Sequence, residues 1–155
     1  MRSIGNTLVL LAGTLASLTS AAQPVKPTLT YLYSVTFSGS APIDFGATPL
    51  GNLSLTPLTG GSVVAAGGDW NLLDSQGNFH PDVRETFKTD DGAYIQIYQT
   101  GSGPQPGGVA HVQLSFVTGS PKYYWLNKVV AVGILKPVSQ TEVTIDAWQV
   151  GTAQS

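Results

Sequence analysis

Acidic residues and one internal arginine are the groups in this chain whose types could perform chemistry. Six of the nine carboxyl side chains lie between positions 69 and 91: Asp69, Asp74, Asp82, Glu85, Asp90 and Asp91. Arg84 lies among them and is the only arginine beyond position 2. We expect Arg84 to form a bidentate pair with Asp69 or Asp82. Such a pair is either a structural ion pair or a site in which a carboxylate is the general base and Arg84 stabilises an oxyanion.

Aromatic residues accompany these polar groups. Trp70 follows Asp69, and Tyr124 and Trp125 precede Asn127. Large aromatics in β-proteins usually fill the core, but buried indole and phenol groups need polar partners. We therefore expect one small-molecule pocket, with Asp69 as the preferred base because Trp70 beside it would exclude water. Its predicted catalytic residues are Asp69, Arg84 and Asp91, and its predicted ligand-binding residues are Trp70, Tyr98, Tyr124, Trp125 and Asn127.

Other kinds of chemistry find little support in the residues. There is no cysteine, and only two histidines, His80 and His111, so we expect neither thiolate catalysis nor a zinc site. No serine lies in a nucleophile-elbow setting, and the aspartates do not follow the spacing of an EF-hand calcium loop. No glycine-rich phosphate loop opens a helix. We accordingly expect no metal and no cofactor.

Composition limits the class of protein. The 155 residues predict a single domain, and only 10% of them are charged, with a formal net charge of -2. Scattered lysines and arginines disfavour a nucleic-acid partner, which would require a basic face. A hydrophobic content of 42%, with 18 glycines and 10 prolines, indicates a compact, turn-rich globule. The oligomeric state stays open, a homodimer included.

The first 22 residues have the features of a secretory signal peptide. Arg2 precedes an apolar run from position 8 to 18, and Ser20-Ala21-Ala22 fits the small-residue pattern before a cleavage site. The run is shorter than the roughly 20 residues of a membrane-spanning helix. We expect a signal peptide at 1–22, a secreted domain at 23–155 and no membrane span. In a eukaryotic host, Asn52-Leu53-Ser54 is an acceptor site for N-glycosylation at Asn52.

Short runs of alternating or β-branched residues separated by turn residues predict an all-β fold, a single small antiparallel β-barrel. A glycine- and proline-rich run at 101–108 predicts a mobile loop. The predicted strands cover residues 28–37, 52–56, 62–66, 82–89, 93–100, 109–118, 127–135 and 141–150.

Asp91-Gly92 predicts a two-residue hairpin turn between the fourth and fifth of these strands. That turn would pair Lys88 with Ile95 and Arg84 with Gln99. It would place Glu85 and Tyr98 on one face, opposite Arg84. Because both faces would then be mixed, the pairing favours a barrel that holds a ligand.

Several motifs in fixed order resemble the domain-of-unknown-function 3237 family of bacterial and fungal proteins. They are Gly67-Gly68-Asp69-Trp70, Asp82-Val83-Arg84, Thr89-Asp90-Asp91-Gly92-Ala93 and Tyr123-Tyr124-Trp125-Leu126-Asn127-Lys128. The similarity runs from about Gly46 to Val150, with a shortened segment between Gly51 and Gly68. The resemblance implies a small antiparallel β-barrel and no established reaction.

Two functions remain open on this basis. The first is a cofactor-independent isomerase, cyclase or lyase acting on a small polyketide-like or aromatic molecule, such as one of fungal secondary metabolism. The second is a secreted carrier that binds an apolar ligand without chemistry. A carboxyl group whose pKa is raised by burial would favour the enzyme, whereas a fully paired Asp–Arg bridge would favour the carrier.

Overall fold

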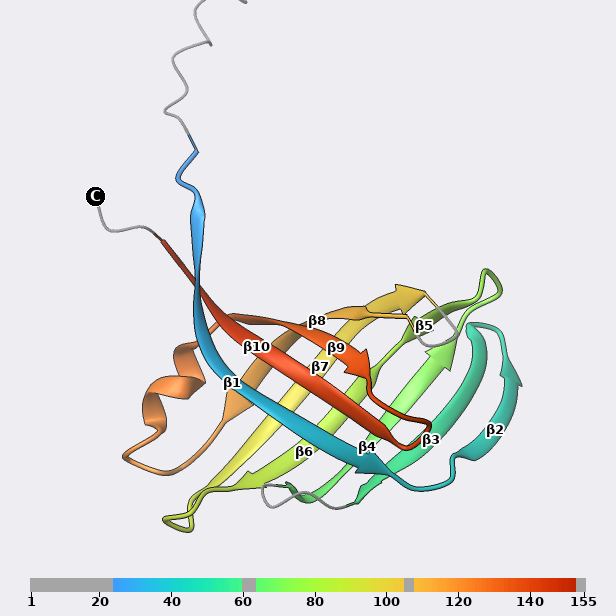
Figure 1. Ribbon diagram of the computed structural model, residues 1–155, viewed down its shortest axis with the longest axis horizontal. Helices are drawn as coiled ribbons and strands as arrows, with labels where there is room; N and C mark the ends of the chain where they lie inside the picture. Colours follow the sequence, from blue (N-terminus) through green and yellow to red (C-terminus); the bar gives the residue numbers. More distant parts are fainter. Residues whose placement is uncertain (1–23, 60–63, 105–107, 153–155) are drawn as a thin grey trace, which may run out of the picture.

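The computed structural model describes residues 24–59, 64–104 and 108–152. They form ten strands and one short 3-10 helix (Figure 1). The strands are β1 (Pro27–Gly39), β2 (Ile43–Thr48), β3 (Gly51–Thr59), β4 (Val64–Leu73), β5 (Asn78–His80), β6 (Asp82–Lys88), β7 (Tyr94–Pro104), β8 (Ala110–Val117), β9 (Ala131–Pro137) and β10 (Glu142–Thr152). The helix, η2 (Tyr124–Lys128), connects β8 to β9.

Antiparallel pairings carry the strands around a barrel-like ring. The circuit runs through β1, β10, β9, β8, β7, β6, β4 and β3. Within the described residues it returns to β1 through two residue pairs, Ser38 with Thr59 and Gly39 with Leu58. β2 pairs with the first half of β3, and β1 pairs with its end. β5 pairs with both β4 and β7. The all-β prediction is confirmed, as a barrel-like arrangement.

Alternation along the strands separates an apolar interior from the outer face. On β8, Ala110, Val112, Leu114 and Phe116 are buried while the residues between them are exposed. Inward residues of β9, β10 and β1 complete the core, including Ala131, Ile145 and Phe37, none more than 3% exposed. The period of two in the sequence follows from this geometry, since successive side chains of a strand point to opposite faces.

The predicted register of the β6–β7 hairpin is wrong by one residue. Lys88 pairs with Tyr94 and Arg84 with Tyr98, because the turn is longer than two residues. Thr89 and Ala93 close it through a backbone hydrogen bond of 2.9 Å, and Gly92 adopts a φ of 83°. A one-residue shift moves every side chain of one strand to the other face. Tyr98 therefore lies outside with Arg84, and the inner face becomes largely apolar.

Other predicted boundaries also change. The predicted loop at 101–108 is wrong over Gly101–Pro104, which continue β7, while residues 105–107 lie outside the described residues. The predicted strand at 127–135 is wrong at its start, where η2 intervenes, and β2 and β5 were not predicted. The predicted signal peptide at 1–22 also lies outside the described residues.

Candidate functional site

A cavity opens at the end of the ring formed by the β1–β2 and β9–β10 connections. It consists of three adjoining spaces that share Phe79. The central compartment, about 270 Å³, contains Asp69 between the apolar side chains of Phe37, Leu58 and Val143. The apolar compartment, about 130 Å³, extends from these residues to Val83 and Leu135. The polar compartment, about 350 Å³, lies towards the rim, beside Asn52, Ser54 and Asn71.

Asp69 is the carboxyl group that the strands place in this cavity. It lies on β4, pairs in register with Thr56 and Val83, and is 9% exposed. Its Oδ1 accepts a hydrogen bond of 3.0 Å from the backbone N–H of Asp82. Burial raises the pKa of Asp69 to about 7, more than the hydrogen bond from Asp82 lowers it. This carboxyl group therefore gains and loses its proton near neutral pH, as a general acid or base requires.

Polar side chains of β3 and β4 line the cavity beside Asp69. Ser54 Oγ donates a hydrogen bond of 2.7 Å to Asn71 Oδ1. Asn71 Nδ2 donates at longer distances, 3.4 Å to Thr56 Oγ1 and 3.3 Å to the Asp69 carbonyl. Bonds this long are weak, so the amide of Asn71 and the hydroxyl of Thr56 remain able to bond a ligand.

Arg84 and Trp70 lie on the outer face. The expected partner of Arg84 is confirmed as Asp82, through contacts of 3.4 Å from Nε and 3.3 Å from Nη2. The guanidinium lies 5.5 Å from the centre of the Trp70 ring. Because Trp70 follows Asp69 on one strand, it points away from the cavity, so its predicted shielding of Asp69 is wrong. Phe37, Leu58 and Val143 line the cavity around the carboxyl group instead.

The remaining predicted site residues lie elsewhere. In Figure 1, η2, with Tyr124, Trp125 and Asn127, is the orange helix at the end of the ring opposite β2. Tyr124 and Trp125 are 57% and 50% exposed. Asn127 Oδ1 accepts a hydrogen bond of 2.9 Å from the Thr118 backbone N–H, and Asn127 Nδ2 donates one of 2.9 Å to the Thr118 carbonyl oxygen. The predicted convergence of these residues with Asp69 and Arg84 is therefore wrong.

Asp91 belongs to the turn between β6 and β7. Its carboxylate lies 2.6 Å from Lys122 Nζ and accepts a hydrogen bond of 3.2 Å from Tyr123 Oη. Lys122 and Thr89 lower the pKa of Asp91 to about 2. The residue thus links the turn to the segment before η2, at a distance in the fold from the cavity.

Sequence reasoning missed a buried polar cluster of Glu85, Gln99 and Tyr33. Glu85 is 1% and Gln99 0% exposed, and Gln99 Nε2 donates a hydrogen bond to Glu85 Oε1. Within the described residues, Glu85 Oε2, Gln99 Oε1 and Tyr33 Oη have no hydrogen-bond partner. Burial raises the pKa of Glu85 to about 8. The alternation of Val83, Glu85 and Phe87 puts Glu85 on an apolar face, and the observed hairpin register brings Gln99 to the same face.

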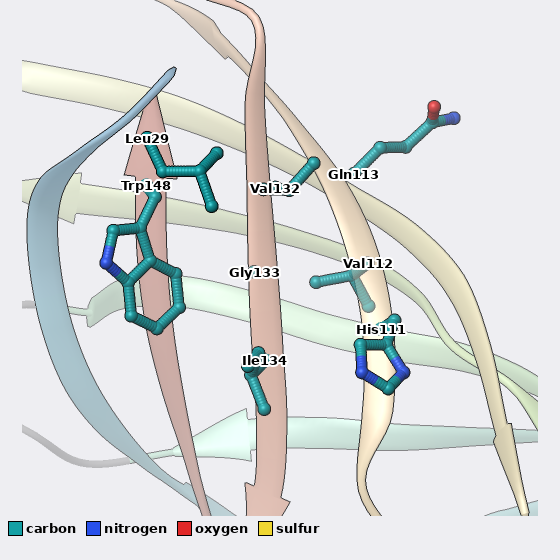
Figure 2. A pocket seen from close by; sticks show the side chains of 8 residues that line it. All are labelled: Leu29, His111, Val112, Gln113, Val132, Gly133, Ile134 and Trp148. Atoms are coloured by element: carbon teal, nitrogen blue, oxygen red, sulfur yellow. The ribbon is translucent and has the colours of Figure 1, made fainter. Parts of the chain in front are cut away.

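A separate depression, about 460 Å³, lies on the outer face of β8, β9 and β10 (Figure 2). Leu29 and Trp148 flank β9 on one side, and His111 and Gln113 flank it on the other. No carboxyl group lines it, so it lacks the acid–base group that the interior cavity has. In the described part of the chain, no group of three ligating side chains could hold a metal ion, and no helix is long and apolar enough to cross a membrane.

Comparison with known proteins connects this fold to a family and to an enzyme. Residues 27–150 match the sequence profile of a family described as "Protein of unknown function (DUF3237)". The chain is 26% identical over 137 residues to a hydroalkoxylation enzyme, phnH, of Penicillium herquei, an alignment covering 83% of this chain and 87% of that protein. The similarity extends the resemblance seen in the sequence to β1.

Solved structures share the architecture. A beta-barrel-like protein from Acinetobacter baumannii has a TM-score of 0.70 at 26% identity, over 84% of this chain and all 100% of that one. An enzyme from Penicillium herquei has a TM-score of 0.65 at 24% identity, over 84% of this chain and 99% of that one. At that identity the second likeness concerns the fold alone. Together they support the barrel-like description.

Proposed function

The chain belongs to the DUF3237 family, and from this premise we propose that it is a cofactor-independent enzyme transferring a proton to and from a small organic molecule. The observation that carries the proposal is the Asp69 carboxyl group, buried in an interior cavity with apolar walls and with a pKa raised to about 7. The relative from Penicillium herquei supports the reaction class, because hydroalkoxylation is the addition of an alcohol O–H across a carbon–carbon double bond.

The proposed reaction uses Asp69 as both acid and base. The protonated carboxyl group gives its proton to one alkene carbon, and the hydroxyl oxygen of the same molecule forms a bond to the other carbon. The hydroxyl proton then returns to the carboxylate. Asp82 N–H holds Oδ1, which leaves Oδ2 to carry the exchanging proton. The product is an isomer, a cyclic ether, and no oxidant or cofactor is consumed. An isomerisation through an enol would use the same group.

The alternative function is a carrier that binds an apolar molecule in the same cavity. A fully paired Asp69–Arg84 bridge would favour it, but Arg84 pairs with Asp82 on the outer face. Asp69 instead has the raised pKa expected of an acid–base catalyst. The geometry therefore supports the enzyme better than the carrier.

The proposal is tested with 2-alkenylphenols, which carry an alkene and a hydroxyl group in one molecule. We expect the wild-type protein to convert members of the panel to cyclic ethers of unchanged mass, and in deuterium oxide to add one deuterium to carbon. Asp69→Asn should lower the rate at least about a hundredfold, the usual contribution of a general acid–base group.

Asp91→Asn is the matched control, because it removes an exposed carboxylate far from the cavity, and it should leave the rate unchanged. Full activity of Asp69→Asn would contradict the proposed mechanism. Binding of the phenols by the wild-type protein without conversion would favour the carrier.

We further propose that residues 1–22 are a cleaved signal peptide and that the domain at 23–155 is secreted, with a small organic molecule as its partner. The support is the sequence pattern alone. N-terminal sequencing of protein from the medium should begin at Gln23, and a start at Met1 would contradict the proposal. Asn52 is exposed on β3, as a glycosylation site must be. In a eukaryotic host, glycan removal should reduce the mass of the wild-type protein but not that of Asn52→Gln.

A further inference from the structure

The two ends of the cavity differ in chemistry, with Asp69 between them. Every side chain that lines the apolar compartment is apolar except that of Asp69. The polar compartment is lined by Asp44, Asn52, Ser54 and Asn71 together with four apolar or proline residues. Ser54 and Asn71 also line the central compartment, which makes the polar surface continuous up to Asp69. A ligand that fills the cavity must match both kinds of surface.

The charges along the cavity select against an anionic ligand. None of the described residues that line the three compartments is a lysine or arginine, while Asp44 and Asp69 supply carboxyl groups. Burying an anion here would leave its charge unpaired, which is costly. The Asn71 amide and the Thr56 and Ser54 hydroxyls instead suit neutral hydroxyl or carbonyl groups.

The apolar compartment also limits size. A group as large as a water molecule takes up about 30 Å³ in a liquid. The volume of about 130 Å³ therefore holds a hydrocarbon arm of about four carbons. Leu58 lines both this compartment and the central one, so its side chain sets the space beyond Asp69.

We propose that the substrate is a neutral amphipathic molecule whose hydrocarbon arm enters the apolar compartment and whose hydroxylated body lies against Ser54, Thr56 and Asn71. The bond that changes lies at Asp69, where the two parts meet. Leu58 sets the length of the arm and Asn71 binds the body. This inference rests on the proposed function, because it takes Asp69 as the reacting group.

Binding of 4-alkylphenols, measured by isothermal titration calorimetry, tests the arm. Affinity should rise about fourfold per methylene, the value of burying one CH₂, and stop rising near butyl. The chain length at which affinity stops rising should increase by about two carbons in Leu58→Ala and decrease in Leu58→Phe. Leu73→Ala, which enlarges only the polar compartment, is the matched control and should not change it.

A comparison of 4-butylphenol with butylbenzene tests the body. The wild-type protein should prefer the phenol by about three- to tenfold, the effect of one hydrogen bond. Asn71→Leu, which keeps the branched shape of the side chain but removes its hydrogen-bonding groups, should abolish the preference. Gln113→Leu on the outer face should retain it.

The two proposals fail separately. In Asp69→Asn the affinity should still stop rising near butyl, because this substitution leaves the compartments intact. If that variant stays active towards alkenylphenols, the proposed function fails while the compartments stand. If the chain length at which affinity stops rising does not respond to either Leu58 variant, or if no alkylphenol binds, the amphipathic assignment is overturned while the acid–base role of Asp69 stands.

Discussion

At Asp69, burial sets the protonation state of a single side chain. Taking a carboxylate out of water costs free energy, and one backbone hydrogen bond from Asp82 does not restore it, so the proton is held up to about pH 7. Among the residues that the structure describes, no cation lies near enough to reverse the shift, since Arg84 is held on the opposite face of the sheet by Asp82 and Trp70. The arrangement gives the cavity one exchangeable proton at neutral pH.

Asp69→Asn should remove a pH-dependent cost to stability. In the unfolded chain the carboxyl group ionises near its ordinary pKa of 3.8, whereas the folded protein holds the proton to about 7. Stability from this group is therefore greatest below pH 4 and falls as pH rises towards 7. Between pH 4 and 7, the free energy of unfolding of the variant should therefore increase by a few kcal/mol relative to that of the wild type. Urea unfolding at several pH values measures this, and a constant difference would contradict it.

Arg84→Lys should have little effect, because the Asp82 ion pair and the Trp70 contact are both exposed. Surface pairs of this kind contribute about 0–1 kcal/mol, so the melting temperature should fall only slightly. Binding of 4-butylphenol should be unchanged, since the guanidinium does not line the cavity. A large loss of binding would show that Arg84 contributes to the site after all.

Residue identity was enough to single out Asp69 and to narrow the partner of Arg84 to Asp69 or Asp82, of which the structure shows Asp82. It could not tell which face of a strand each side chain occupies. Trp70 and Tyr98 were therefore predicted to line the pocket, although both lie on the outer face, and the fully buried Glu85 was overlooked. Ser54 and Asn71 carry no distinctive spacing, and only the β3–β4 pairing brings them together beside the cavity.

At the scale of elements, the β6–β7 hairpin shows why the site could not be assembled from sequence. Asp91-Gly92 correctly marks a turn, but the Thr89 hydroxyl bonds both the Asp91 carboxylate and the Ala93 N–H in a longer loop than the dipeptide suggests. That one extra residue reverses the faces of β7 relative to β6. Most strands, β2 and β5 excepted, were predictable from alternation and β-branched residues. Register depended on hydrogen bonds in the turn, which alternation does not encode.

Glycines in β7 are needed where its neighbours approach closely. A Cβ on Gly101 would lie 2.0 Å from the His111 carbonyl oxygen, whereas one on Gly119 would meet nothing within 4 Å. Gly101→Ala should therefore shift the β7–β8 pairing and lower the free energy of unfolding by more than about 2 kcal/mol, a size typical of a steric clash in a packed region.

Gly119→Ala is the matched control for this prediction and should stay within about 0.5 kcal/mol of the wild type. Denaturant unfolding of both variants makes the comparison. Equal stability of the two would indicate that residues 101–104 form a loop, as first expected, rather than the end of β7.

For the whole molecule, two buried carboxyl groups tie stability to pH in the same direction. Burial raises the pKa of Glu85 to about 8, from an ordinary value of 4.5, as it raises that of Asp69. The carboxylates of Asp74, Asp91 and Asp146 are hydrogen-bonded and have lowered pKa values. Their contributions to stability are small because solvent screens them, and they are lost only under acid conditions. The protein should be most stable near pH 4 to 5 and weaken steadily towards pH 8.

The double variant Asp69→Asn/Glu85→Gln should flatten the fall in melting temperature between pH 5 and 8. Both amides can still accept the hydrogen bonds from Asp82 N–H and Gln99 Nε2. Asp44→Asn/Asp90→Asn, which removes two exposed carboxylates that do not act on Asp69 or Glu85, serves as the control and should keep the wild-type slope. A slope unchanged in the first double variant would mean that neither interior group is protonated at neutral pH.

A ¹³C NMR titration of the Asp69 carboxyl carbon, assigned by its loss in Asp69→Asn, tests most directly whether Asp69 exchanges a proton at neutral pH. We expect a midpoint near pH 7, displaced when 4-butylphenol fills the cavity and removes water from the carboxyl group. A midpoint near 3.8, the ordinary value for aspartate, would contradict this expectation. Asp69 would then be an ionised residue at neutral pH, and the proposed proton transfer would have no donor in the cavity.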